Sequence, residues 1–82
     1  MDKSYYTARL KTLTARIAAL GPRIERAHQS VRRLETEPVP AGATATRAAQ
    51  LSSARTMALT LEDRSRQLRI AEAALRAEIT AA

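Results

Sequence analysis

Residues 37–43 read Glu37-Pro38-Val39-Pro40-Ala41-Gly42-Ala43, and this short stretch divides the chain of 82 residues into two halves. Its two prolines and one glycine stop any helix. On both sides the chain is rich in Leu, Ala, Arg, Glu and Gln, which favour helices, and no alternating apolar run indicates a strand. The sequence therefore predicts one all-α domain over residues 1–82, with helices at about 3–36 and 44–81 and a loop at 37–43.

Both predicted helices carry a heptad repeat of apolar residues. In the first helix, Leu10, Ile17, Ile24 and Val31 occupy one core position, and Tyr6, Leu13, Leu20, Ala27 and Leu34 occupy the other. The second helix repeats the pattern less strictly at Leu51, Ala54, Ala58, Leu61, Ser65, Leu68, Glu72, Leu75 and Ile79. A sustained 3–4 spacing is typical of a coiled-coil seam. We therefore expect a two-helix antiparallel coiled-coil hairpin.

A chain reversal at residue 39 predicts the register of the two seams. The facing pairs are Leu34 with Thr44, Ala27 with Leu51, Ile24 with Ala54, Leu20 with Ala58, Ile17 with Leu61, Leu13 with Ser65, and Leu10 with Leu68. In most of these layers a large side chain faces a small one, as close packing requires. Tyr6 faces Glu72 in this register, and the Glu72 carboxylate is expected to accept a hydrogen bond from the phenol.

Gly21 and Pro22 interrupt the apolar pattern of the first predicted helix. Proline in a helix interior costs about 3 kcal/mol, because it lacks the N–H and its ring crowds the preceding turn. One interpretation is a kink on the outward face, and the other is a break with Pro22 at the first position of a new helix. The heptad phase continues unchanged from Leu20 to Ile24, which favours the kink.

Composition limits the size of any core. The chain has 18 alanines, two tyrosines and no Phe, Trp or Cys, so it buries little apolar area and forms no disulfide. A hairpin has a single seam, and small folds of this kind need additional contacts. Leu59 and Ile70 lie outside the seam, and we expect them to mediate self-association into a homodimeric four-helix bundle. The alternative is that they are ordinary scattered surface residues.

Catalytic and metal-binding patterns are absent from the sequence. His28 is the single histidine, and with Glu25 it provides two of the three or four ligands that a metal site needs. Glu62 and Asp63 are adjacent and point to different sides of a helix, which makes them a poor acid–base pair. We therefore expect a protein that is not an enzyme and binds no cofactor or metal. No apolar run approaches the ~20 residues of a membrane span, so we expect a cytoplasmic location.

Arginine is the one residue type whose pattern indicates binding. The chain has 12 arginines and a net charge of +6, and its first 35 residues carry eight basic and three acidic side chains. Arg9, Arg16 and Arg23 are spaced by seven and form a stripe along one edge of the seam, with Arg64 opposite Arg16. In the predicted register no carboxylate of the second helix faces this stripe. Guanidinium groups bind carboxylates and phosphates through paired hydrogen bonds.

These four arginines lead to a functional hypothesis. We expect a protein–protein interaction module (an adaptor, small subunit or inhibitor) that docks Arg9, Arg16, Arg23 and Arg64 on a partner with an acidic surface. One alternative is sequence-nonspecific, salt-sensitive binding of nucleic-acid backbones by the same residues. Another is a structural oligomer whose arginines form only a solvated flank, with their aliphatic stems covering the seam.

Overall fold

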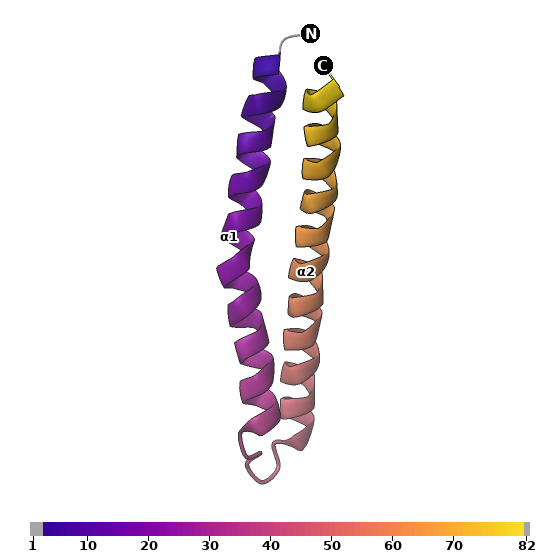
Figure 1. The fold of residues 1–82 in the computed structure, drawn as a ribbon. Coiled ribbons are helices and arrows are strands. Elements are labelled where there is room, and N and C mark those ends of the chain that lie inside the picture. The colour runs from indigo at the N-terminus through magenta and orange to yellow at the C-terminus, as the bar shows by residue number, and fades with distance from the viewer. Residues whose placement is uncertain (1–2, 82) are drawn as a thin grey trace.

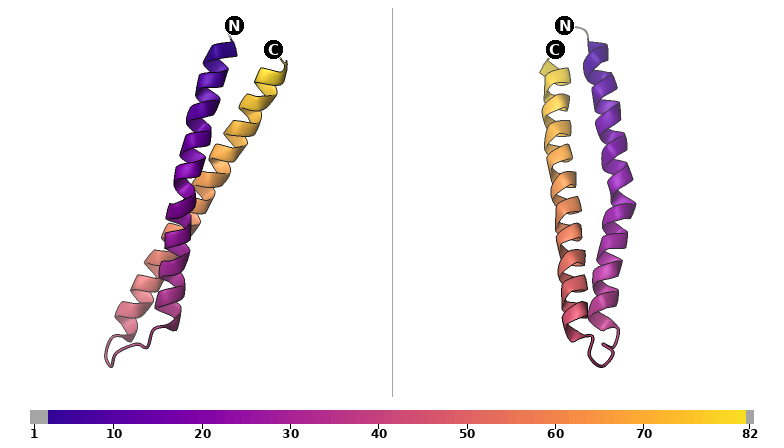
Figure 2. Two further views of the ribbon diagram at one scale, coloured as in Figure 1. Left: turned by 60° about the vertical axis from the view of Figure 1, so that its left-hand side comes forward. Right: turned by 180° about the vertical axis from the view of Figure 1, so that it is seen from behind.

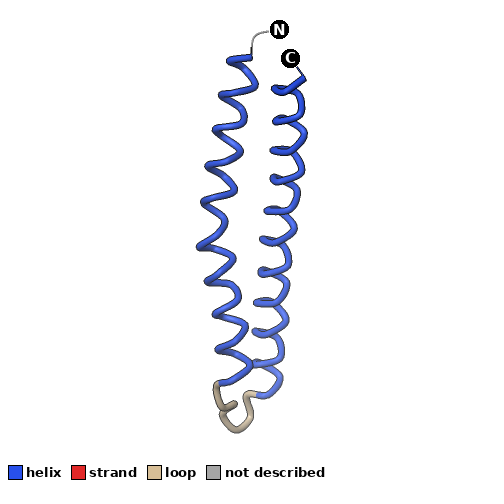
Figure 3. The backbone as a smooth tube through the Cα atoms, in the orientation of Figure 1, coloured by secondary structure: helices blue, strands red, loops and turns tan. Residues whose placement is uncertain are grey.

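The computed structural model describes residues 3–81 and consists of two long helices joined by one loop. Helix α1 spans Lys3–Thr36 and helix α2 spans Thr44–Ala81. The helices lie side by side and run in opposite directions, so the start of α1 and the end of α2 lie at the end of the molecule remote from the loop (Figure 1). The hairpin is elongated, with extents of 64 × 15 × 13 Å. No strand occurs among the described residues, and the secondary structure is helix and loop alone (Figure 3).

Burial follows the heptad pattern, as the sequence predicts. The buried residues are Leu13, Leu20, Ala27, Ala58, Leu61 and Ser65. Every other residue of the two heptad repeats is half-buried, including Tyr6 near the start of α1 and Ile79 near the end of α2. The helices cross at a shallow inclination when seen from the side (Figure 2), as expected for coiled-coil packing. The prediction of which helix faces pack together is therefore confirmed.

The register of the two helices differs from the prediction by about one heptad. Thr14 donates a hydrogen bond of 3.0 Å from Oγ1 to Oε2 of Glu72, whereas the predicted register placed Tyr6 opposite Glu72. The central core cluster contains Leu20, Ala27, Ala58 and Leu61, and the half-buried residues packed against it are Ile24 and Leu68. The predicted layers Ile17 with Leu61 and Leu10 with Leu68 are therefore wrong. A shift of a whole heptad keeps every seam residue in the seam, so the apolar pattern alone does not distinguish the two registers.

The loop contains a turn that requires glycine. The N–H of Ala43 donates to the carbonyl of Pro40 at 3.0 Å, and Gly42 between them has a φ of 79°. A positive φ at the third residue of a four-residue turn defines a type II turn, which excludes most side chains at that position. The carbonyl of Ala43 then accepts the first bond of α2 from the N–H of Arg47, at 2.9 Å. Helix α2 thus begins directly after the turn.

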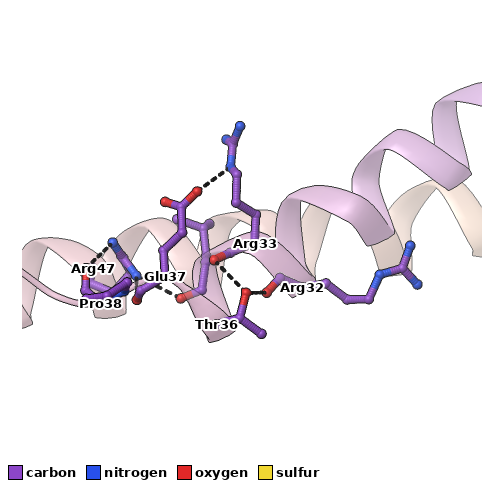
Figure 4. Close-up of polar contacts among 7 residues, drawn as sticks. Arg32, Arg33, Thr36, Glu37, Pro38 and Arg47 are labelled. Atoms are coloured by element: carbon purple, nitrogen blue, oxygen red, sulfur yellow. Dashed lines mark hydrogen bonds and ion pairs between the residues drawn. The ribbon is translucent and has the colours of Figure 1, made fainter.

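Arg47 ties the start of α2 to the end of α1 (Figure 4). Its Nη1 atom donates to the carbonyl oxygens of Leu34 at 2.9 Å and Glu37 at 2.8 Å, and Nη2 donates to Pro38 at 3.4 Å. The last carbonyls of a helix lack partners within the helix and carry partial negative charge. One guanidinium therefore satisfies one such carbonyl of α1 and two carbonyls of the loop, and it fixes the geometry of the loop.

Helix α1 continues through Gly21 and Pro22 without interruption. The break that would give three helices is therefore wrong. Both residues are exposed, so the proline ring lies on the outward face and leaves the seam intact. Pro22 has no N–H to donate to the carbonyl of Ala18, and that turn of α1 has one hydrogen bond fewer than an ordinary turn.

Candidate partner-binding groove

One edge of the hairpin carries charges that are paired between the helices. We call this edge the paired edge. Nε2 of His28 contacts Oε1 of Glu62 here, and Nη2 of Arg55 lies 3.5 Å from Oε2 of Glu35. Glu72 accepts the hydrogen bond from Thr14 on the same edge. The contact between His28 and Glu62 joins the two helices, whereas the sequence suggested Glu25, a residue of the same helix, as the neighbour of His28. The carboxylates that reach across the seam therefore gather on the paired edge.

The opposite edge carries arginines without carboxylate partners. Arg16 and Arg23 from α1 and Arg64 from α2 line one hollow of about 380 Å³. Three apolar residues also line this hollow: Leu20, which is buried in the seam, Leu68, which is half-buried, and Ala19, which is exposed. None of the described residues that line it is acidic. This edge therefore combines guanidinium groups with a small exposed apolar surface.

A second hollow of about 220 Å³ continues the first toward the loop. The residues that line it are Arg23, Arg26, Ala27, Ser30, Met57 and Leu61. Arg23 is shared by both hollows, so the two form one continuous feature. We call this feature the arginine groove and define it by Arg16, Arg23, Arg26 and Arg64.

The guanidinium groups of the groove make no ion pair or hydrogen bond with any residue in the range 3–81. In contrast, five arginines outside the groove have acidic neighbours: Arg32, Arg33, Arg55, Arg66 and Arg76. For example, Nη2 of Arg32 lies 3.6 Å from Oε1 of Glu25, and Nη1 of Arg66 lies 3.3 Å from Oδ1 of Asp63. Like charges on one rim repel one another, although exposure to water and salt weakens the repulsion. An anionic partner would relieve this repulsion and gain charge-assisted hydrogen bonds.

The four arginines singled out from the sequence do not all share one site. Arg16, Arg23 and Arg64 line the same hollow, but Arg9 lies one heptad before Arg16 and is not among its lining residues. Arg26 lines the groove although the heptad stripe did not include it. It lies three residues after Arg23 on the same side of α1, and this i,i+3 relationship was the signal that could have found it.

The two residues expected to mediate self-association are both exposed. Leu59 exposes 66% of its surface and Ile70 exposes 58%. They are eleven residues apart, close to three helical turns, and so lie on the same side of α2. Leu59 lines an apolar hollow of about 330 Å³ together with His28 and Val31 on the paired edge. Leu59 and Ile70 therefore lie on a different side of the hairpin from the arginine groove.

The described residues form neither a metal site nor a membrane-spanning helix. Within residues 3–81, no three His, Cys, Asp or Glu side chains are grouped so that they could hold a metal ion. Neither α1 nor α2 contains a stretch apolar and long enough to cross a bilayer. Comparisons of the chain with protein-family models, with curated proteins and with solved structures gave no match. The candidate sites on the hairpin are therefore the arginine groove and the exposed face of α2.

Proposed function

We propose that the protein is a non-enzymatic interaction module that uses the arginine groove to dock on an acidic surface of another protein. The observation that carries this proposal is the meeting of Arg16, Arg23 and Arg64 around one hollow without an acidic neighbour. The carboxylates of Glu35, Glu62 and Glu72, which reach across the seam, lie on the other edge, where they already have partners. The three guanidinium groups around the hollow therefore offer an incoming anion positive charge that no carboxylate lining the hollow neutralises.

The floor of the groove favours a protein partner over nucleic acid. Half-buried Leu68 and exposed Ala19 present apolar surface between the arginines, which a phosphate backbone cannot cover favourably. Proteins that bind single strands use aromatic side chains as stacking platforms. The rings of Tyr5 and Tyr6 instead contact each other edge to face, with 5.5 Å between their centroids. They lie at the end of α1 remote from the loop, and Tyr6 is about 15 Å along the helix from Arg16. Nucleic-acid binding remains the competing hypothesis.

We also infer that two hairpins associate through the exposed face of α2 into a four-helix bundle. The hairpin exposes 6029 Å², whereas a compact protein of 9.0 kDa exposes about 4,900 Å². The excess of about 1,100 Å² is comparable to the ~800 Å² that one partner buries in a stable interface. Leu59 and Ile70 supply apolar area on that face. Because the groove lies elsewhere, a dimer would keep two grooves accessible.

We further propose that Gly21 and Pro22 produce a kink on the outward face of α1. Proline in a helix interior usually bends the helix away from its own side, because the ring displaces the carbonyl of the preceding turn. The step lies between Arg16 and Arg23, so the direction of the bend sets how these two groove residues are presented. The unbroken seam on both sides of the step supports a bend of α1 over a separate third helix.

Charge reversal tests the proposed function. We expect the wild-type protein to bind poly-L-glutamate, and Arg16→Glu with Arg64→Glu to abolish this binding. The matched control is Arg32→Glu with Arg66→Glu, which changes the charge by the same amount outside the groove and should keep most of the binding. Equal loss in both double variants would show that only net charge matters. Tighter binding to random duplex DNA than to poly-L-glutamate at physiological salt would favour the nucleic-acid hypothesis.

A further inference from the structure

We propose that the occupant of the arginine groove is an acidic amphipathic α-helix of the partner protein, which lies along the hairpin and completes a three-helix coiled coil. This inference rests on the proposed function and specifies the partner's chemistry. It follows from the spacing of the two hollows, from the positions of the arginines between them, and from the charge of the chain itself.

The seam residues that line the groove repeat after one heptad. Leu20 lies in the first hollow and Ala27 in the second, seven residues later on α1. Helix α2 supplies Leu68 to the first hollow and Leu61 to the second, again seven residues apart. One heptad of helix rises about 10.5 Å. A third helix with an apolar side chain at every seventh position would place one side chain in each hollow, whereas an irregular acidic loop has no such repeat.

The arginines have the spacing that flanking charges of a coiled coil require. Arg16 and Arg23 are seven residues apart on α1, and Arg64 faces them from α2. In coiled coils, residues that flank the apolar positions carry opposite charges on neighbouring helices and select the partner. Glu or Asp residues that flank the apolar positions of the third helix would therefore meet guanidinium groups on both rims. The partner sequence should carry an apolar residue every seven positions, with carboxylates beside each one.

A second copy of this chain does not fit the groove. The chain has 14 basic and eight acidic residues, so a second hairpin would bring more arginines to an arginine-lined edge. Its interhelical carboxylates, such as Glu35 and Glu62, are already engaged with Arg55 and His28. Like charges that face each other across a coiled-coil interface select against pairing. The groove is therefore complementary to a different, acidic helix.

Synthetic peptides of about three heptads test this inference directly. The first probe has Leu at the positions that face the hollows and Glu at the flanking positions. The second has the same composition in an order that destroys the heptad repeat, and the third has Lys in place of every Glu. Binding is measured by calorimetry at low and physiological salt, and the gain of helix is measured by circular dichroism.

We expect the heptad peptide to bind about tenfold or more tightly than the reordered acidic peptide, and to become helical on binding. The Lys peptide should not bind. Arg16→Glu with Arg64→Glu should abolish binding of the heptad peptide, whereas Arg32→Glu with Arg66→Glu should retain it. If Arg16→Glu with Arg64→Glu loses helix content, peptide binding is compared instead for Arg16→Gln with Arg64→Gln.

The outcomes separate this inference from the proposed function. Equal affinity for the heptad and reordered acidic peptides would overturn the helical partner and leave an acidic docking surface in place. Failure of both acidic peptides to bind would overturn both proposals. Equal binding of the Glu and Lys peptides would overturn recognition by charge, and with it the role of the groove arginines.

Discussion

The side chain of Arg47, at the start of α2, donates a 2.9 Å hydrogen bond to the carbonyl of Leu34, near the end of α1. The same guanidinium also reaches the carbonyls of Glu37 and Pro38. Hydrogen bonds from charged donors contribute about 1.5–3 kcal/mol when they are partly shielded from water. Arg47 is half-buried, so its contribution to the closure of the hairpin exceeds that of an exposed arginine.

Replacement of Arg47 by Ala is expected to lower the free energy of unfolding by about 2 kcal/mol, because it leaves carbonyls at the end of α1 without a donor. Urea denaturation followed by circular dichroism measures the change. Arg66→Ala serves as the control, since Arg66 forms only an exposed pair with Asp63, and it should change stability by less than about 0.5 kcal/mol. Equal effects of the two substitutions would contradict the role of Arg47.

The two glycines should respond oppositely to alanine. Gly21→Ala is expected to stabilise the hairpin by about 1 kcal/mol, because alanine favours helix and its Cβ would meet nothing within 4 Å. Gly42→Ala is expected to destabilise it by about 1 kcal/mol, because the φ of 79° is strained for any side chain. Thermal unfolding of both variants measures the difference. A loss of stability in Gly21→Ala would show that the glycine serves the bend at Pro22.

The register of the helices can be tested with engineered disulfides, because the chain has no cysteine of its own. The hydrogen bond between Thr14 and Glu72 predicts that Leu20 and Ser65, about two helical turns nearer the loop, face each other across the seam. Cysteines at these two positions should cross-link rapidly within one chain. Cysteines at Leu20 and Ala58, the pair from the sequence-based register, should form the bond much more slowly. The reverse order of rates would contradict the register.

Self-association through α2 predicts a protein that is dimeric at high concentration by light scattering. Leu59→Glu with Ile70→Glu should give a monomer, because it places charges in the middle of the proposed interface. Val39→Glu is the control, since Val39 is an exposed apolar residue of the loop, and this variant should remain dimeric. A monomeric wild-type protein at high concentration would exclude the four-helix bundle. The melting temperature of a monomeric wild-type protein would also be independent of protein concentration.

The heptad pattern predicts the secondary structure and the buried face, because a seven-residue repeat of Leu, Ile and Ala allows only one helix face to be shielded. It does not predict the register, because displacement by a whole heptad preserves the pattern. The hydrogen bond between Thr14 and Glu72 distinguishes the two registers, and no heptad pattern contains that information. For the same reason, the contact of His28 with Glu62 was missed in favour of Glu25, the near neighbour in sequence.

The sequence also predicts part of the groove. The seven-residue spacing places Arg16 and Arg23 on one edge, and the hairpin brings Arg64 to the same edge. The hollows between these arginines form where the small side chains of Ala19 and Ala27 lie beside larger leucines. Their shape depends on how the two helices pack, so the sequence pattern does not predict it. Arg9 illustrates the limit of the pattern, because it shares the stripe but does not line the hollow.

The absent N–H of Pro22 has a mechanical consequence for the hairpin. The turn that ends at Pro22 lacks one of its hydrogen bonds and is preceded by Gly21, so it resists bending less than the other turns of α1. This compliant turn lies between Arg16 and Arg23, and flexing there changes the curvature of the binding edge while the seam stays closed. A stiff α1 would match only one curvature of a bound partner, whereas an α1 with a flexible turn can follow partners of different superhelical curvature.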